Sequence, residues 1–329
     1  MKKIFNIGLI GCGIVGIKRI NNLPKKFRLI ACSDIKRENF KNISKKNIFF
    51  TKSWKKLLRL KELDAVIIAT THHLHSKILF ECIRLNIHAL VEKPGGISSL
   101  TIKKIILLLR KKNFLAIRVG FNHRYHPAFL MAKKMVQLNK IGPIMYIRAV
   151  YGHGGRLNYN REWRFKKRFS GGGELIDKGS HLIDLSRIFL GNLRPHAYKL
   201  NTSFWNMKLE DNCFLILKND KDKVAFLHSS CTEWKNKFIF EIFGKNGKIE
   251  INGLGKSYGK ESLTFFKMSK KMGPPQKKKY HFNSKIDKSW NLELEDFYED
   301  IKRKRKSSPG ITDSYENLKI IDTIYKKKL

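Results

Sequence analysis

The sequence predicts an α/β protein with a doubly wound parallel sheet in the first half of the chain and a second domain after it. In the first half, short apolar runs alternate with segments of helical length, which is typical of βαβ units. The chain has 329 residues, of which 42 % are hydrophobic, enough at roughly 150 residues per domain for about two domains. We therefore expect a first domain over residues 1–121 and a second over 122–329, with the last helix packing back on the first domain.

Five apolar runs are the expected strands of the first domain: residues 4–10, 28–33, 65–70, 88–91 and 114–119. Runs that are apolar throughout indicate parallel strands buried on both faces. Ligands of a doubly wound sheet bind at the carboxyl ends of its strands. The segments at these ends are Gly11 to Gly16, Asp34, Thr70-Thr71, Glu92-Lys93-Pro94 and Asn122-His123-Arg124.

A glycine motif follows the first strand and reads Gly11-Cys12-Gly13-Ile14-Val15-Gly16. In this G-x-G-x-x-G spacing the first glycine permits a tight turn, the second lets a pyrophosphate approach, and the third allows close packing of helix on strand. The helix that follows directs unpaired N–H groups at the phosphates. The alternative is a glycine-rich turn of another α/β protein, but the order of strand, turn and helix favours dinucleotide binding.

An acidic residue, Asp34, ends the second strand, 18 positions after Gly16. A carboxylate about 20 residues beyond the motif binds the adenosine ribose hydroxyls and repels a 2′-phosphate, so NAD is the expected cofactor. Lys36 and Arg37 follow directly and would reach such a phosphate, so NADP stays open. The residues assigned to cofactor binding are the six of the motif and Asp34, Arg37, Thr70, Thr71, His75, Glu92, Lys93 and Pro94.

Basic residues far outnumber acidic ones, with 68 Lys and Arg against 27 Asp and Glu and a net charge of +41. Such an excess suggests a polyanionic partner, but a nucleic-acid binder concentrates its charge on one arm or face. Here the basic residues are spread along the whole chain, which favours compositional drift, and we expect no nucleic-acid partner. One stretch, between Glu92 and Glu162, contains no Asp or Glu and is expected to be electropositive.

Five scattered cysteines form no C-x-x-C pair, which indicates a reduced, cytoplasmic compartment. No apolar run approaches the length of about 20 residues that spans a bilayer, so no membrane association is expected. The run before Cys12 is interrupted by Asn6 and Gly8, unlike the apolar core of a signal peptide.

The cluster His72-His73-Leu74-His75 lacks metal-ligand spacing, so we expect a loop there and no metal.

The second half contains a glycine-rich block, residues 170–184, in which Asp177 and His181 are four positions apart. On a helix this spacing places both side chains on one face. A carboxylate beside an imidazole raises the pKa of the imidazole and fixes its orientation, as a general base or acid requires. The alternative is an ordinary surface pair, but the run Gly171 to Gly173 would allow a ligand to approach closely.

The chain resembles the Gfo/Idh/MocA oxidoreductases, the group of glucose–fructose oxidoreductase and inositol dehydrogenase. The motifs that carry the resemblance are Gly11 to Gly16, Glu92-Lys93-Pro94, Gly120-Phe121-Asn122-His123-Arg124-Tyr125-His126-Pro127, and the block from Gly171 to Asp184. The resemblance implies a second domain built on an open, mostly antiparallel sheet, with helices on one face and a homodimer or homotetramer contact on the other. Compatible strands are residues 144–151, 213–217, 224–229, 238–243 and 249–251, and compatible helices are 290–302 and from 314 onward.

The resemblance implies an NAD(P)-dependent oxidoreductase acting on a hydroxyl or ketone carbon of a sugar, inositol, sugar acid or nucleotide sugar. It assigns catalysis to one relay: His181 takes the proton, Asp177 orients it, and Lys93 polarises the oxygen. The expected substrate contacts are Asn122, Arg124, Tyr125, Arg156, Trp163, Arg164 and Lys178. For Lys178 the alternative is a side chain that points to solvent, and for Trp163 a packed aromatic ring. The electropositive stretch favours an anionic substrate.

Two other functions stay open at this stage. The same scaffold would suit a glycoside hydrolase that uses bound NAD for transient oxidation, with no net redox change. A non-catalytic cofactor sensor or nucleic-acid-binding protein would bind cofactor without turnover and bind DNA in a strongly salt-dependent way. The intact set of Lys93, Asp177 and His181 favours an enzyme, but it does not separate a dehydrogenase from a hydrolase.

Overall fold

The computed structural model describes residues 3–43, 47–269, 271–282 and 286–326. The chain forms two compact units, residues 1–121 with 290–318 and residues 122–289 with 319–329, and each is described by itself. Segment 290–318, which the sequence places in the second domain, belongs to the first unit. The division into domains at residue 121 stays a prediction.

Six parallel strands form the sheet of the first unit, in the order β3-β2-β1-β4-β5-β6. Their bounds are β1 (Phe5–Ile10), β2 (Phe27–Ser33), β3 (Phe49–Thr51), β4 (Ala65–Ile68), β5 (His88–Glu92) and β6 (Ile117–Gly120). This is the strand order of a doubly wound dinucleotide-binding sheet, so the predicted fold class is confirmed for the first half. The sequence did not predict β3, because its three residues form no buried apolar run.

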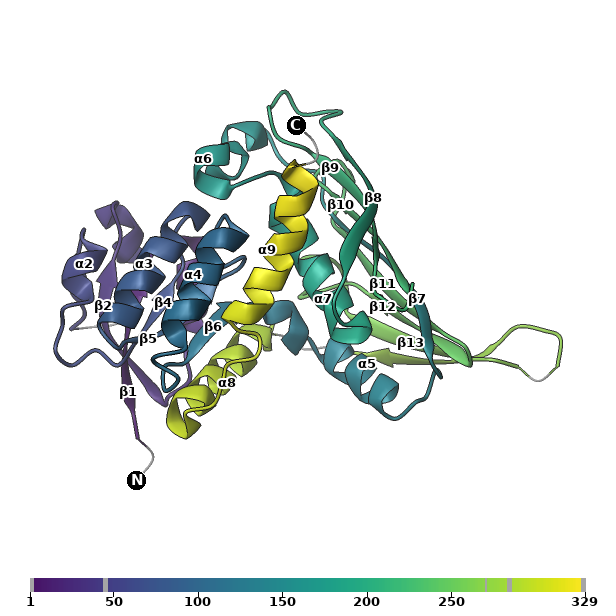
Figure 1. Cartoon of the computed structure of the whole chain (residues 1–329), viewed down its shortest axis with the longest axis horizontal. Coiled ribbons are helices and arrows are strands. Elements are labelled where there is room, and N and C mark those ends of the chain that lie inside the picture. The colour runs from purple at the N-terminus through teal and green to yellow at the C-terminus, as the bar shows by residue number, and fades with distance from the viewer. Residues whose placement is uncertain (1–2, 44–46, 270, 283–285, 327–329) are drawn as a thin grey trace. The chain divides into compact units, whose positions relative to one another are not determined.

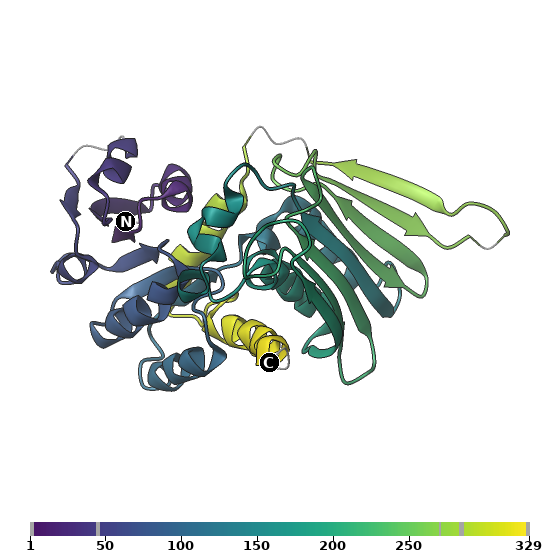
Figure 2. The same cartoon turned by 90° about the horizontal axis from the view of Figure 1, so that it is seen from above.

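Helices lie on both faces of this sheet (Figures 1 and 2). They are α1 (Ile14–Asn21), η1 (Arg37–Asn42), α2 (Trp54–Leu57), α3 (His72–Arg84), α4 (Ser99–Leu109), α8 (Ser289–Arg303) and the first half of α9 (Ile311–Lys326). The expected loop at His72 is wrong, because α3 begins there. The apolar side of α8 belongs to the core of the first unit, where the Phe297 ring stacks on Phe27 at 5.9 Å.

Eight strands form the sheet of the second unit, in the order β14-β13-β12-β11-β7-β10-β9-β8. Only the pair β7 and β10 is parallel, so the expected mostly antiparallel sheet is confirmed. The strands are β7 (Ile144–Gly152), β8 (Arg194–Asn201), β9 (Asn212–Lys218), β10 (Val224–Ser230), β11 (Lys237–Gly244), β12 (Gly247–Asn252), β13 (Ser262–Lys267) and β14 (Gln276–His281). The sequence missed β8, β13 and β14, and β14 carries three consecutive exposed lysines in place of an apolar pattern.

Helices cover one face of this second sheet, chiefly α5 (Pro127–Gln137) and α7 (Ser180–Leu190) (Figures 1 and 2). The shorter segments are η2 (Asn122–Tyr125), η3 (Tyr159–Arg161), η4 (Trp163–Phe165), α6 (Lys167–Ser170) and η5 (Leu175–Gly179), the last a π-helical turn. The strands also expose aromatic side chains, among them Tyr146 and Phe226. The homodimer or homotetramer contact expected of the free sheet face stays a prediction.

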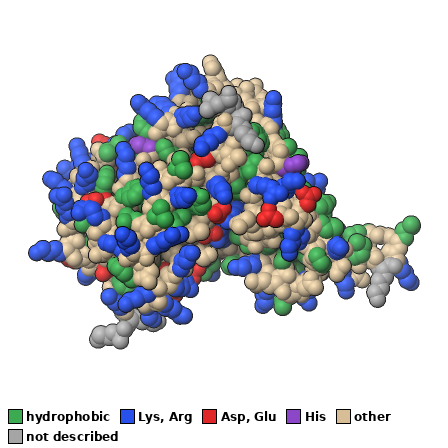
Figure 3. All heavy atoms as spheres, viewed as in Figure 1, with side chains coloured by type: hydrophobic (Ala, Val, Ile, Leu, Met, Phe, Trp, Pro, Cys, Tyr) green, Lys and Arg blue, Asp and Glu red, His purple; other side chains and the backbone are tan. Residues whose placement is uncertain are grey.

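Lysine and arginine side chains are spread over the visible surface and form no single patch there (Figure 3). All five cysteines are buried thiols. Within the described ranges, no helix has the length and apolar character needed to cross a membrane.

Candidate functional site

The glycine motif forms the turn between β1 and α1, and its three glycines have different surroundings. Gly11 has a φ of +96°, and a Cβ built on it would lie 2.5 Å from the carbonyl oxygen of Ala69. A Cβ on Gly16 would lie 2.0 Å from the carbonyl oxygen of Gly11. A Cβ on Gly13 would meet no atom within 4 Å. Two glycines are therefore required by packing, while the open space at Gly13, at the start of α1, fits a pyrophosphate group.

Asp34 is bound to the same turn. Its Oδ2 accepts a hydrogen bond from the Cys12 N–H at 2.7 Å, and its Oδ1 accepts from the Lys36 N–H at 2.8 Å. The carboxylate is thus held at the end of β2 beside the glycines, as the sequence predicts for a ribose-binding acid. Ile14 and Ile35, next to these polar groups, are 82 % and 81 % exposed, which leaves apolar surface suited to a nucleoside. These features together fit a dinucleotide.

His75 supports the next loop of this edge instead of facing solvent. Its side chain is fully buried on α3, and its Nε2 lies 3.0 Å from the Thr70 carbonyl oxygen. Because a carbonyl only accepts, Nε2 carries the proton and donates it. Burial lowers the pKa of His75 to about 4. The nearby Thr71 hydroxyl contacts His73 Nδ1 at 3.0 Å, so side chains of α3 hold the predicted cofactor loop.

The Glu92-Lys93-Pro94 segment ends β5 and is fixed by buried groups that the sequence did not single out. Arg19 of α1 is fully buried and donates to Glu92 Oε1 at 2.6 Å and to Glu293 Oε2 of α8 at 2.5 Å. The Ser314 hydroxyl of α9 donates to the carbonyl oxygen of Pro94. These contacts determine where the backbone beside Lys93 lies. The sequence carries no specific signal for Arg19, which follows another cation, Lys18, in the same short helix.

In the second unit, His181 lies in the first turn of α7, within a group of aromatic rings. Its ring stacks on that of His123 at 3.7 Å, and the Tyr151 ring lies edge-on at 6.1 Å. His123 Nε2 lies 3.3 Å from the Tyr151 hydroxyl, and its Nδ1 lies 3.1 Å from Asn122 Oδ1. Burial raises the pKa of Tyr151 well above its usual range, so this hydroxyl stays protonated. His181 is thereby fixed in orientation by residues from η2 and β7.

Two predicted substrate residues are engaged inside the protein. Asn122 is buried and donates to the Ser289 hydroxyl at 3.0 Å in addition to its contact with His123. Arg124 forms a bidentate pair with buried Asp184, at 2.8 and 2.5 Å. The Arg124–Asp184 pair holds η2 against α7 and so positions the stacked histidines. The predicted substrate role of both residues, and of half-buried Tyr125, stays a prediction.

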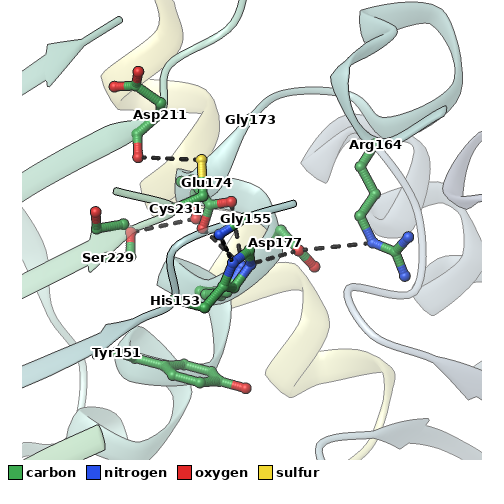
Figure 4. Close-up of polar contacts among 12 residues, drawn as sticks. Tyr151, His153, Gly155, Arg164, Gly173, Glu174, Asp177, Asp211, Ser229 and Cys231 are labelled. Atoms are coloured by element: carbon green, nitrogen blue, oxygen red, sulfur yellow. Dashed lines mark hydrogen bonds and ion pairs between the residues drawn. The ribbon is translucent and has the colours of Figure 1, made fainter. Parts of the chain in front are cut away.

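Asp177 lies on the π-helical turn just before α7, so it and His181 are not on one continuous α-helix as the sequence predicts. Single π-helical turns recur at functional sites because they redirect a side chain. Asp177 Oδ2 lies 3.6 Å from Lys178 Nζ and 3.9 Å from Arg164 Nε. Figure 4 shows Arg164 directed at this carboxylate from the other side of the site. The structure therefore brings together three predicted residues, with two cations beside one acid.

Lys178 does not point to solvent, and that alternative is wrong. The residue is 5 % exposed, and its ammonium donates to both oxygens of Glu174 at 3.0 and 3.2 Å. Burial alone would lower the pKa of Lys178, but the carboxylates of Glu174 and Asp177 hold it well above its usual range. Glu174 is fully buried. The sequence carried a signal for this pair, since the two residues are four positions apart, but their partnership was not predicted.

The run Gly171 to Gly173 has a packing reason, which differs from the close ligand approach that the sequence suggested. A Cβ on Gly172 would lie 2.0 Å from the Tyr325 hydroxyl, and one on Gly173 would lie 2.4 Å from the Glu210 carbonyl oxygen. Glu210 Oε1 in turn accepts from the Gly173 N–H at 3.1 Å and from the Tyr325 hydroxyl at 2.6 Å. These glycines let the block lie directly on buried neighbours.

His153 and Tyr159 form the remaining polar group near Lys178. His153 Nδ1 accepts from the Gly155 N–H at 2.8 Å, so in the neutral ring Nε2 donates to the Tyr159 hydroxyl at 3.0 Å. Burial, with the charge of Lys178, lowers the pKa of His153 to about 3, which excludes it as a proton acceptor near neutral pH. Trp163 is half-buried with the Arg164 guanidinium over its ring at 5.0 Å, and its expected substrate contact stays a prediction.

No group of three or more His, Cys, Asp or Glu suited to a metal ion occurs among the residues that the structure describes. The first unit has the construction of a dinucleotide-binding domain, and the second holds a buried histidine, His181, stacked on His123 and preceded by the turn that carries Asp177.

The chain belongs to the Gfo/Idh/MocA oxidoreductase family. Residues 5–121 match the family's NAD-binding Rossmann fold, and residues 133–328 match its C-terminal alpha/beta domain. The resemblance predicted from the motifs is thereby confirmed.

Two curated relatives illustrate the range of similarity. Levoglucosan dehydrogenase of Pseudarthrobacter phenanthrenivorans is 32 % identical over 154 residues, covering 46 % of this chain and 39 % of that protein. Myo-inositol 2-dehydrogenase of Thermotoga maritima is 25 % identical over 192 residues, covering 56 % of this chain and 54 % of that protein. The aligned part thus spans about half the length of these relatives or less.

Solved structures share the fold over nearly the whole chain. Levoglucosan dehydrogenase in complex with NADH and levoglucosan has a TM-score of 0.88 at 22 % identity, covering 98 % of this chain and 97 % of that one. A 3-ketoreductase from Actinomadura kijaniata in complex with NADP and TDP-benzene has a TM-score of 0.83 at 16 % identity, covering 97 % and 96 %. At these identities the likeness concerns the fold alone.

Proposed function

We propose that the protein is an NAD-dependent oxidoreductase that transfers hydride between nicotinamide and a hydroxyl-bearing carbon of a carbohydrate-like substrate. The observation that carries this proposal is the buried, ring-stacked His181 in the same block as Asp177, in a chain whose first unit has an open glycine cradle beside Asp34. The named activities of the levoglucosan and inositol dehydrogenases support the substrate class.

In the direction of alcohol oxidation, the hydroxyl proton moves to the His181 imidazole as the carbon loses hydride and becomes a ketone. Bound NAD supplies the acceptor for that hydride. The ring stack with His123 holds His181 in one orientation. In this proposal Asp177, on the turn that leads into α7, would supply the negative charge that favours the protonated imidazole. Asp34 and the glycine turn would hold the adenosine and pyrophosphate of the cofactor. The catalytic role expected for Lys93 stays a prediction.

His181→Ala tests this role. We expect NADH binding to remain as in the wild type, while turnover falls by about 100-fold or more, because a positioned general base contributes roughly that much. His196→Ala, an exposed histidine on β8, is the matched control and should keep full activity. Wild-type turnover by His181→Ala would remove His181 from the mechanism.

The same assay separates the proposed dehydrogenase from the hydrolase that the sequence left open. A dehydrogenase forms one NADH for each substrate oxidised, followed by absorbance, whereas the hydrolase would release sugar with no net NADH. Titration of the purified protein with NADH and NADPH by fluorescence decides between the two cofactors, and we expect tighter binding of NADH because Asp34 repels a 2′-phosphate. Binding of neither form would refute the proposed function.

A further inference from the structure

The cations that approach the site of the second unit are each already matched by a carboxylate. The pairs are Lys178 with Glu174 and Asp177, Arg164 with Asp177 and Glu162, Arg156 with Glu162, and Arg124 with Asp184. Four cations therefore face four carboxylates. This balance is local and contrasts with the net charge of +41 for the whole chain.

The balance depends most on Glu174. Lys178 lies closest to Asp177 of all these cations, at 3.6 Å, and its side chain is only 6 % exposed. Glu174, with 0 % exposure, binds the same ammonium with both oxygens from within the protein. Figure 4 shows the Glu174 carboxylate and Arg164 on opposite sides of Asp177. Without Glu174, Asp177 would be the one carboxylate of this group left to pair with the buried ammonium of Lys178.

Arg156 and Arg164 are less available to a substrate anion than the sequence suggests, because both are already paired with carboxylates. Both lie beside Glu162, and Arg164 is 3.2 Å from Glu162 Oε2 as well as 3.9 Å from Asp177. A bidentate contact to a substrate carboxylate or phosphate would require Arg164 to exchange these partners. Arg124 is already bidentate with Asp184. A substrate anion would therefore approach four described cations of the second unit that are each already paired with a carboxylate.

We propose that this site takes an uncharged polyol or sugar in preference to a sugar acid or sugar phosphate, and that Glu174 sets this preference by neutralising Lys178. The proposal rests on the proposed oxidoreductase function and narrows its substrate class. It reverses the preference for an anionic substrate that the electropositive stretch of sequence suggested. The overall positive charge attracts anions from a distance, but it is screened within about 10 Å, whereas discrimination of a bound group depends on contacts.

The test compares substrates that differ only in charge, with NAD and NADP as cofactors. Suitable pairs are D-glucose with D-glucuronate, D-galactose with D-galacturonate, and D-glucose with D-glucose 6-phosphate. We expect kcat/KM for the neutral member to exceed that of the acid by at least about tenfold, with little dependence on salt concentration. Faster oxidation of the charged members would overturn the proposal and leave the oxidoreductase function standing. Binding of neither NADH nor NADPH would refute the oxidoreductase function and, with it, this inference.

Two variants test the role of Glu174. Glu174→Gln leaves the Lys178 charge only partly matched, and we expect the ratio of acid to neutral kcat/KM to rise by about tenfold. The double variant with Glu174→Gln and Lys178→Gln restores neutrality and should return the ratio toward that of the wild type. Equal ratios in the single and double variants would refute the role of Glu174.

The control for overall charge is Asp220→Asn. This substitution changes the net charge by the same amount as Glu174→Gln. Asp220 lies on the exposed turn that follows β9, whereas Asp211 directly precedes the other end of that strand. We expect its substrate ratio to equal that of the wild type, and a tenfold rise here would show that overall charge governs selection. If Glu174→Gln does not fold, the comparison of neutral and charged substrates with the wild type still decides the proposal.

Discussion

We predict that the free energy of unfolding of the first unit falls in mild acid because of the buried, neutral His75. Its Nε2–H donates to the Thr70 carbonyl, so a second proton would have to enter at Nδ1. This atom is buried and has no hydrogen-bond partner among the described residues. An added charge there would gain no acceptor to offset its desolvation, and burial accordingly lowers the pKa of His75 from 6.5 to about 4.

The size and sign of the effect follow from this pKa difference. Above pH 6.5 the ring is neutral in both the folded and the unfolded chain, so stability does not depend on it. Between pH 6.5 and pH 4 the unfolded chain takes up the proton and the folded chain does not, so stability falls as the pH falls. A difference of about 2.5 in pKa, at about 1.4 kcal/mol for each unit, corresponds to about 3 kcal/mol, of which about 2 kcal/mol is lost by pH 5.

The measurement compares the wild type with His75→Gln, whose side-chain amide keeps a donor near Thr70 but does not titrate. Urea unfolding at pH 7.5 and pH 5, with amide hydrogen exchange of residues 65–79 as a local probe, gives the free energy of unfolding of each protein. Other titrating groups contribute equally to both proteins, so the wild type should lose about 2 kcal/mol more than the variant. An equal loss in the two proteins would refute the assignment of a neutral, buried His75.

Two further predictions concern the first unit. Gly16→Ala should lower both stability, by about 1–3 kcal/mol, and NADH affinity, because its Cβ would lie 2.0 Å from the Gly11 carbonyl oxygen. Gly13→Ala should lower NADH affinity alone, since its Cβ meets no protein atom within 4 Å, and thermal unfolding with an NADH titration distinguishes the two. Arg118→Met should cost about 1–3 kcal/mol in urea unfolding, because fully buried Asp300 loses two charge-assisted hydrogen bonds from Arg118 at 2.6 and 2.9 Å but keeps the one from Arg305; no measurable loss would contradict this.

Local sequence patterns were sufficient for much of the first unit. Apolar runs, the glycine spacing and Asp34 predicted the parallel sheet and the cofactor side of the site, because each pattern depends on neighbours a few residues away. The short or polar strands β3, β8 and β14 were missed for the same reason. Their residues carry no apolar pattern of their own, and pairing with neighbouring strands stabilises them.

In the candidate site, the sequence by itself determined which residue types are present and in what order, including Asp177, His181 and the glycine run. Only the tertiary structure decided their surroundings: His123 stacked on His181, and Lys178 turned inward to Glu174. The physical reason is the distance along the chain over which each interaction acts. Turn geometry and helix spacing act between neighbours in the chain, whereas burial of a charge depends on which distant segments exclude water and which carboxylate they place beside it.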